Sequence, residues 1–242
     1  MKLGTLHGIG VGPGDPELIT LKGVSILARC RHVFVPKPEQ DSGSVALSIA
    51  RQHLRPDAEI GELLFPMTTD PKDLDQRWED SARQVAKVLE CGEDACFLTL
   101  GDPFLYSTYI YLARALRRLL PAATVVTVPG IMAFAAAAAL SNFAIGEGRE
   151  PVSIIPTADD LSAVRRALTV GGTVVLMKIG TRLPSVLDLL EEHSALDHAV
   201  FVARAGLDGQ HIETDLRKLR LAGSKAGYLS VVLVHASQEA RR

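Results

Sequence analysis

Short runs of apolar and β-branched residues alternate along almost the whole 242-residue chain with longer segments in which apolar residues recur every three or four positions. The run at 95–100, followed by a segment with Tyr109, Leu112 and Leu116 on one helical face, is one example. Repeated alternation of this kind is typical of parallel strands joined by helical crossovers. The sequence therefore predicts an α/β fold in which most strands are parallel.

The expected elements can be placed by residue number. Strands are expected at residues 3–9, 32–35, 59–64, 95–100, 124–128, 152–155, 173–177, 199–203 and 229–235. Helices are expected from Asp15-Pro16 onward, where Asp15 is a favourable N-cap, and at 44–54, 71–89, 109–119, 131–140, 160–168, 184–191 and 216–219. The last two strands are separated by glycines and only a short charged helix, which favours some antiparallel pairing in the second half.

A chain of this length forms one large domain or two small ones. Pro121 ends a helix near the middle of the chain, and the alternation of strands and helices starts again after it. We expect two α/β domains, 1–120 and 121–242, with a mainly parallel sheet in the first and a mixed sheet in the second. No low-complexity linker separates the halves, which favours a broad interface between them.

Charge and composition exclude several classes of protein. Lys and Arg total 26 against 28 Asp and Glu, so no basic surplus indicates nucleic acid or an anionic membrane. The longest apolar run, at 131–140, is half the roughly 20 residues that span a bilayer, and no signal segment is evident. The three cysteines and seven histidines lack the spacings of a disulfide framework or a metal site. We expect a cytoplasmic protein without a metal.

The loop at residues 8–15 reads Gly-Ile-Gly-Val-Gly-Pro-Gly-Asp after the first strand. The third glycine of a GxGxxG fingerprint falls on Pro13 in one register and on Asp15 in the other, and no GxxxxGK[ST] occurs. A carboxylate at the helix start also disfavours a bound phosphate. Two interpretations remain: a tight turn that needs positive φ, or a loop whose backbone approaches a ligand.

Two further loops follow predicted strands, where open α/β sheets bind ligands. In the loop at 101–108, Asp102 is either an N-cap or one of several hydrogen-bonding groups, together with the hydroxyls at 106–108. In the loop at 128–131, Pro129-Gly130 leads into a helix made mostly of alanine. The alanines permit close packing against a sheet or against a ligand, and the sequence does not separate these alternatives.

Three stretches in this order, Gly10 to Gly23 (GVGPGDPELITLKG), Gly101-Asp102-Pro103 and Val128-Pro129-Gly130-Ile131, resemble the tetrapyrrole methylase family over essentially the whole chain. With residues 33–36 and 101–108, the chain is most similar to the precorrin-2 C(20)-methyltransferase branch of cobalamin biosynthesis. The resemblance implies two α/β domains, a homodimer, and an active site in the interdomain cleft where S-adenosylmethionine binds. Arg31-His32 departs from relatives, which tend to carry Ala-Asp there.

The resemblance also implies site residues. The donor S-adenosylmethionine would contact Gly101, Asp102, Pro103, Tyr106, Ser107, Thr108, Pro129, Gly130, Met132, Ala133, Met177 and Ala205. The tetrapyrrole would face Gly10, Gly12, Pro13, Gly14, Asp15 and Lys178, with Arg182 and Arg204 as further cations for its carboxylates. A donor without phosphate suits glycine loops that lack a P-loop lysine.

Methyl transfer to a carbon requires a base for the proton that the substrate loses. Asp102 is the first candidate and Tyr228 the second, although Tyr228 is equally well interpreted as a core residue at a strand end. Three alternatives stay open: a methylase of the same superfamily acting on another tetrapyrrole position or on RNA, a nucleotide-dependent oxidoreductase with a degenerate fingerprint, and a binding module without catalysis. The sequence does not distinguish metal-free from cobalt-containing substrate.

Overall fold

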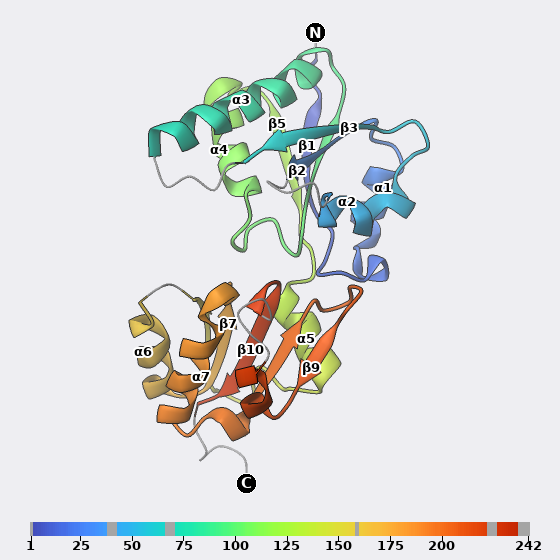
Figure 1. Ribbon diagram of the computed structural model, residues 1–242. Helices are drawn as coiled ribbons and strands as arrows, with labels where there is room; N and C mark the ends of the chain where they lie inside the picture. Colours follow the sequence, from blue (N-terminus) through green and yellow to red (C-terminus); the bar gives the residue numbers. More distant parts are fainter. Residues whose placement is uncertain (1, 38–42, 66–70, 158–159, 222–226, 237–242) are drawn as a thin grey trace. The chain divides into compact units, whose positions relative to one another are not determined.

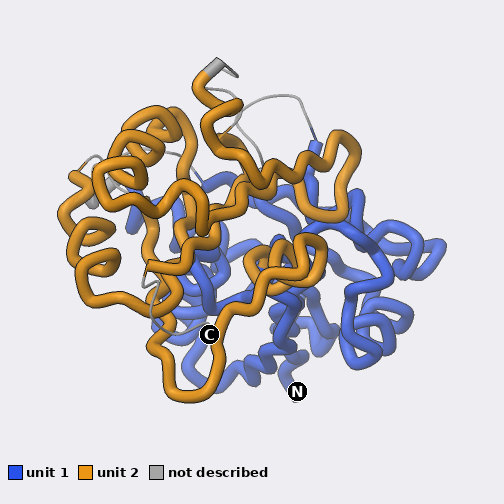
Figure 2. Tube along the Cα trace, turned by 90° about the horizontal axis from the view of Figure 1, so that it is seen from below, with its two compact units in different colours: residues 1–132 blue, residues 133–242 orange. Residues whose placement is uncertain are grey.

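The computed structural model describes residues 2–37, 43–65, 71–157, 160–221 and 227–236. The chain divides into two compact units, Met1–Met132 and Ala133–Arg242 (Figure 2). The division falls after Met132 rather than after residue 120, because the strand at 124–128 pairs with the first strand of the chain. Within the described residues, no helix is both long enough and apolar enough to cross a membrane.

The first unit is a parallel sheet with helices on both faces. Its strands are β1 (Thr5–Gly10), β2 (His32–Lys37), β3 (Glu59–Leu64), β4 (Ala95–Thr99) and β5 (Thr124–Val128), and its α-helices are α1 (Leu21–Leu27), α2 (Val45–Ala50), α3 (Pro71–Glu90) and α4 (Tyr109–Leu119). The strand order is β3-β2-β4-β1-β5, and every pairing is parallel. The predicted α/β class and the parallel first sheet are confirmed.

Apolar side chains of this sheet alternate between the two helical layers. Figure 1 shows α3 and α4 on one side of the sheet and α1 and α2 on the other. Leu6 of β1 and Phe97 of β4 belong to the buried cluster formed with α3 and α4, whereas Ile9 of β1 lies close to α1 at Gly23. Burial of both faces explains why the strands of this unit are continuous apolar runs.

The second unit has a mixed sheet. Its strands are β6 (Val152–Pro156), β7 (Thr173–Met177), β8 (Ala199–Ala203), β9 (His211–Glu213) and β10 (Ser230–His235), and its α-helices are α5 (Ala133–Ser141), α6 (Ser162–Val170) and α7 (Leu183–Glu192). The order is β6-β7-β10-β8-β9; only β6 and β7 pair in parallel, and the other pairs are antiparallel. The predicted mixed sheet is confirmed, although the three-residue strand β9 was too short for a pattern to indicate it.

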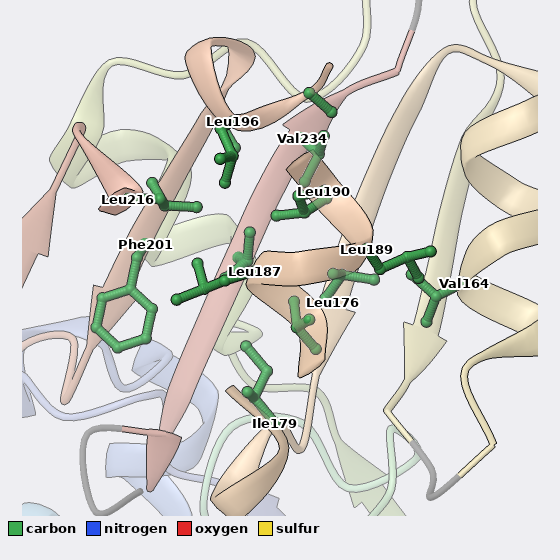
Figure 3. Packing of buried hydrophobic residues seen from close by; sticks show 14 of the residues in the cluster. Val164, Leu176, Ile179, Leu187, Leu189, Leu190, Leu196, Phe201, Leu216 and Val234 are labelled. Atoms are coloured by element: carbon green, nitrogen blue, oxygen red, sulfur yellow. The ribbon is translucent and has the colours of Figure 1, made fainter. Parts of the chain in front are cut away.

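One face of the second sheet packs against α6 and α7 to form a core of aliphatic side chains (Figure 3). Leu176 of β7 and Phe201 of β8 lie against Leu187 and Leu190 of α7, and all four are 1% exposed or less. Helix α5 packs against β8 and β10. The alanine-rich segment therefore makes close helix-to-sheet contact.

The helix expected from Asp15-Pro16 is interrupted. Asp15 caps as predicted, since its Oδ1 accepts the N–H of Glu17 at 2.8 Å, but the element it opens is a three-residue 3-10 turn, Pro16–Leu18. Ile19 and Thr20 then adopt extended backbone, and the Thr20 hydroxyl caps α1 by accepting the N–H of Gly23 at 3.1 Å. Two competing caps five residues apart explain the break.

Candidate active site

Three glycine loops meet where β4, β1 and β5 end, at the carboxyl edge of the first sheet. A Cβ on Gly10 would lie 2.6 Å from the carbonyl oxygen of Gly101 and 2.6 Å from the nitrogen of Gly130. A Cβ on Gly130 would lie 2.1 Å from the same carbonyl oxygen. The loops contact one another backbone to backbone, so a side chain at position 10 or 130 would push them apart.

Hydrogen bonds join the first two loops. The N–H of Gly101 donates to the carbonyl of Gly12 at 2.8 Å, and the N–H of Gly12 donates back to the carbonyl of Gly101 at 3.3 Å. Both glycines have positive φ, 79° at Gly12 and 69° at Gly101. Gly10, Gly12, Pro13 and Gly14 are buried, and the half-buried Asp15 uses its carboxylate on its own turn. The first loop is therefore a positive-φ turn, as one of the two interpretations predicted, and the approach of its backbone to a ligand stays a prediction.

Asp102 joins the second loop to the third. Its Oδ1 accepts the N–H of Phe104 at 2.8 Å, and its Oδ2 accepts the N–H of Gly130 at 3.1 Å. The side chain is 9% exposed. Hydrogen bonds from two backbone donors to a charged, largely buried carboxylate are among the stronger ones in proteins. Asp102 therefore acts as a clamp between the loops at 101–108 and 128–131.

Hydrogen bonds between hydroxyl groups anchor the loop at 101–108 to strands β4 and β5. Ser107 Oγ lies 2.7 Å from Thr99 Oγ1 and accepts the N–H of Tyr109 at 3.1 Å. Tyr109, which is fully buried, places its hydroxyl 2.7 Å from Thr127 Oγ1 on β5. Its ring passes over Gly8 of β1, where a Cβ would lie 2.1 Å from the ring. Burial raises the pKa of Tyr109, so the phenol stays protonated.

Ser107 is buried within this network, whereas its neighbours Tyr106 and Thr108 are more exposed. Tyr106 is 38% exposed and adopts a left-handed backbone with φ of 53°, which is uncommon for a residue other than glycine. Burial raises the pKa of its phenol. Thr108 is half-buried, and Gly101 and Pro103 are buried. In the third loop, Pro129 is exposed while Met132 and Ala133 are half-buried. Residues in strained backbone such as Tyr106 are common at binding sites.

The remaining predicted residues converge at one edge of the second sheet. Because β7 and β8 both run antiparallel to β10, their carboxyl ends and the amino end of β10 share that edge. Met177 ends β7 and Lys178 follows it, Ala205 follows β8, and Tyr228 precedes β10. Tyr228 is 65% exposed, so the interpretation of a core tyrosine is wrong.

At this edge, three non-glycine residues next to the ends of adjacent strands have positive φ. Lys178, Leu229 and Arg204 have φ of 55°, 49° and 53°, and the N–H of Arg204 donates to the carbonyl of Leu229 at 2.9 Å. Arg204 Nε donates to the carbonyl of Asp208 at 2.6 Å, which holds the guanidinium against its own loop. Each non-glycine residue in this region costs on the order of 1 kcal/mol, and such strain gathers at ligand sites.

The chemical groups that these loops present suit an uncharged or cationic ligand better than a phosphate. The loops at 101–108 and 129–132 supply hydroxyls, carbonyls, a thioether and small apolar groups, with neither lysine nor arginine. Adenosine and a methionine-like chain need such partners. Among the described residues, no group of three or more His, Cys, Asp or Glu is placed to hold a metal ion.

The chain matches the sequence profile of a known protein family. The profile described as Tetrapyrrole (Corrin/Porphyrin) Methylases matches residues 5–220. A protein of Salmonella typhimurium named cobalt-precorrin-2 C(20)-methyltransferase is 30% identical over 98% of this chain and 98% of its own length. Precorrin-2 C(20)-methyltransferase of a Sinorhizobium species is 30% identical over 96% and 95%. A probable cobalt-precorrin-2 C(20)-methyltransferase of Methanocaldococcus jannaschii is 36% identical over 72% and 71%.

Solved structures share the fold. The structure of a cobalt precorrin-4 methyltransferase superposes with a TM-score of 0.75 at 20% identity, covering 96% of this chain and 94% of the other. A uroporphyrin-III C-methyl transferase from Thermus thermophilus, complexed with S-adenyl homocysteine, superposes with a TM-score of 0.65 at 18% identity, covering 96% and 97%. At sequence identities of 18–20%, the superpositions show a shared fold and nothing about function.

Proposed function

The chain belongs to the tetrapyrrole (corrin/porphyrin) methylase family, and from that premise we propose that it transfers a methyl group from S-adenosylmethionine to carbon 20 of precorrin-2, or of its cobalt form, in cobalamin biosynthesis. The observation that carries the proposal is the near-complete overlap with two relatives named for C(20) methylation, which cover 98% and 96% of the chain. A relative named precorrin-4 C(11)-methyltransferase covers 77%.

The proposal assigns the donor to Tyr106, Thr108, the backbone at 129–132, Ala133, Met177 and Ala205. When bound, S-adenosylmethionine supplies an electrophilic methyl group on a sulfonium. The residues of this chain would position the donor. The close backbone contacts between Gly10, Gly101 and Gly130 support the proposal that the loops around the donor are rigid.

The proposed substrate contacts include two cations. Lys178 and Arg204 follow strands on either side of β10, so their backbones are about two strand spacings, roughly 10 Å, apart. A tetrapyrrole carries several carboxylates around its rim, and two separated cations can each bind one. Lys178→Met is expected to raise KM for the tetrapyrrole at least several-fold with kcat little changed.

Asp102 is the proposed base, and Tyr228 is the proposed hydrogen-bonding or proton-transfer partner. Each carboxylate oxygen of Asp102 keeps a second lone pair beyond its backbone donor, and the exposed Tyr228 can hydrogen-bond a ligand. Single-turnover rates of Asp102→Asn and Tyr228→Phe at saturating donor test the assignment, because loss of a base lowers that rate by 10²-fold or more.

Calorimetric titration with S-adenosylhomocysteine and, separately, with NAD tests the class of enzyme. We expect binding of S-adenosylhomocysteine and none of NAD; the reverse would favour an oxidoreductase. Incubation with precorrin-2 and with its cobalt form then identifies the methylated carbon and the preferred substrate. Methylation of any other carbon would favour the alternative, a methylase of the same family with another position or substrate.

The expected homodimer and cytoplasmic location are also part of the proposal. Sedimentation equilibrium of the purified chain tests the first, and a dimer mass is expected. Cell fractionation followed by immunodetection tests the second, with the protein expected in the cytoplasmic fraction.

A further inference from the structure

Phe104 is a large apolar side chain in the loop at 101–108 that none of the proposed ligand contacts uses. It is 57% exposed, more than Tyr106 of the same loop at 38%. A single exposed phenylalanine is unremarkable on most of a protein surface. This one follows β4 at the carboxyl edge of the first sheet, where open α/β sheets bind ligands. Its place in the candidate active site therefore calls for a physical reason.

The backbone at Phe104 is held in place. Its N–H donates to Asp102 Oδ1 at 2.8 Å, and the N–H of Leu105 donates to the carbonyl of Asp102 at 3.4 Å. The other carboxylate oxygen of Asp102 accepts the N–H of Gly130 at 3.1 Å, so the loop at 128–131 is attached to the same side chain. Phe104 consequently has a fixed position relative to both loops.

The ring of Phe104 lies against a buried ring. Its centroid is 5.8 Å from that of Tyr109, with 58° between the two planes, and this separation is typical of favourable aromatic pairs. Tyr109 is fully buried, and its hydroxyl lies 2.7 Å from Thr127 Oγ1 on β5. Phe104 thus has a fixed support on one side, while more than half of the residue stays accessible to solvent.

A supported and open aromatic ring suits a flat, conjugated ligand. A tetrapyrrole carries carboxylates on its rim, for which Lys178 and Arg204 are proposed, but the faces of its pyrrole rings are apolar. The other residues proposed for the substrate are glycines, Pro13 and Asp15, none of which has an aromatic ring. Adenine of the donor is also flat, but pockets bury most of a ligand of the donor's size, so one open ring suits the larger substrate better.

We propose that Phe104 is a specificity-determining residue that stacks on one pyrrole ring of the tetrapyrrole substrate. This inference rests on the proposed function, because it requires a tetrapyrrole as the substrate. The contact is noncovalent, and the two rings pack offset or edge to face, as aromatic pairs in proteins do. The stack contributes to binding of the tetrapyrrole and leaves binding of the donor unchanged.

Calorimetric titration of the folded chain with precorrin-2 or its cobalt form, whichever wild type binds more tightly, tests this contact. Saturating S-adenosylhomocysteine is present, because it fills the donor site and has no methyl group to transfer. Phe104→Leu keeps an apolar side chain and removes the ring, so Kd for the tetrapyrrole should rise about 2- to 10-fold. Phe104→Tyr keeps the ring and should bind as wild type does.

Two controls separate a contact with the substrate from a structural role. Tyr111→Leu removes another exposed ring of the same unit, but Tyr111 is on α4 and stacks on Trp78 with centroids 4.4 Å apart. This variant should keep the wild-type Kd for the tetrapyrrole. In Phe104→Leu, Kd for S-adenosylhomocysteine should stay at the wild-type value, and KM for the tetrapyrrole should rise with kcat little changed.

Three outcomes would contradict the account, and they differ in what they refute. Unchanged tetrapyrrole affinity in Phe104→Leu would overturn the inference and leave the proposed function intact. An equal loss of affinity for S-adenosylhomocysteine would also overturn it, because the ring would then serve the donor or the structure of the loop. Absence of tetrapyrrole binding by wild type would refute the proposed function and the inference together, and it is read without any variant.

Discussion

Asp102→Ala removes the clamp between two loops of the first unit. The carboxylate accepts one N–H from Phe104 at 2.8 Å and one from Gly130 at 3.1 Å. A hydrogen bond to a charged group contributes about 1.5–3 kcal/mol. Phe104 is 57% exposed, so water can replace part of the lost bonding, and the lower end applies to each bond. We therefore expect a loss of about 3 kcal/mol in the free energy of unfolding.

For a chain of this size, each kcal/mol corresponds to about 2–4 °C in Tm, so Asp102→Ala should lower Tm by about 6–12 °C. Asp160 provides a matched control, because its Oδ1 accepts the N–H of Ser162 at 2.9 Å but its side chain is exposed and joins no second loop. Asp160→Ala should cost about 1 kcal/mol. Calorimetric melting of both variants measures the difference.

The expected kinetic consequence of Asp102→Ala is a fall of at least 100-fold in kcat/KM, because the loops proposed to position the donor would separate. Donor affinity, measured with S-adenosylhomocysteine, should fall as well. If saturating donor restores the rate of the bound complex, Asp102 is a clamp only, and Tyr228 is left as the proposed base. Unchanged Tm and unchanged donor affinity would refute the structural reasoning.

Three further predictions concern closely packed groups. Gly130→Ala should abolish donor binding and cost about 1–3 kcal/mol in urea unfolding, because its Cβ would lie 2.1 Å from the carbonyl oxygen of Gly101; wild-type affinity would contradict this. Tyr109→Phe, which removes the bond to Thr127, should cost about 1–2 kcal/mol, and an unchanged urea midpoint would argue against that bond. Burial lowers the pKa of His7, so the unfolded chain binds its proton at higher pH and stability should fall as pH drops below about 6.5; His7→Asn should flatten that fall in pH-dependent melting, and an equal slope would count against it.

The part of the fold that the sequence predicted depends on local pattern. Strands such as Ala95–Thr99 are continuous apolar runs because both sheet faces are covered, and the helices between them show their own periodicity. Convergence of the glycine loops was also predictable, since carboxyl ends of parallel strands meet at one edge. For Asp102, the N-cap alternative anticipated the bond to Phe104 and missed the one to Gly130.

The remaining features depend on strand order, which periodicity does not contain. Tyr109 reaches Thr127, 18 residues away, because β1 lies between β4 and β5 and presents Gly8 under the ring. Gly8 was visible only as one glycine of a failed fingerprint.

Methyl transfer with an isotopically labelled donor tests the central claim most directly. The purified chain is incubated with methyl-¹³C S-adenosylmethionine and either precorrin-2 or its cobalt form, and the product is examined by NMR. One labelled methyl group at carbon 20 is the predicted result. Label at another carbon, or no label while S-adenosylhomocysteine binds, would contradict the proposed function.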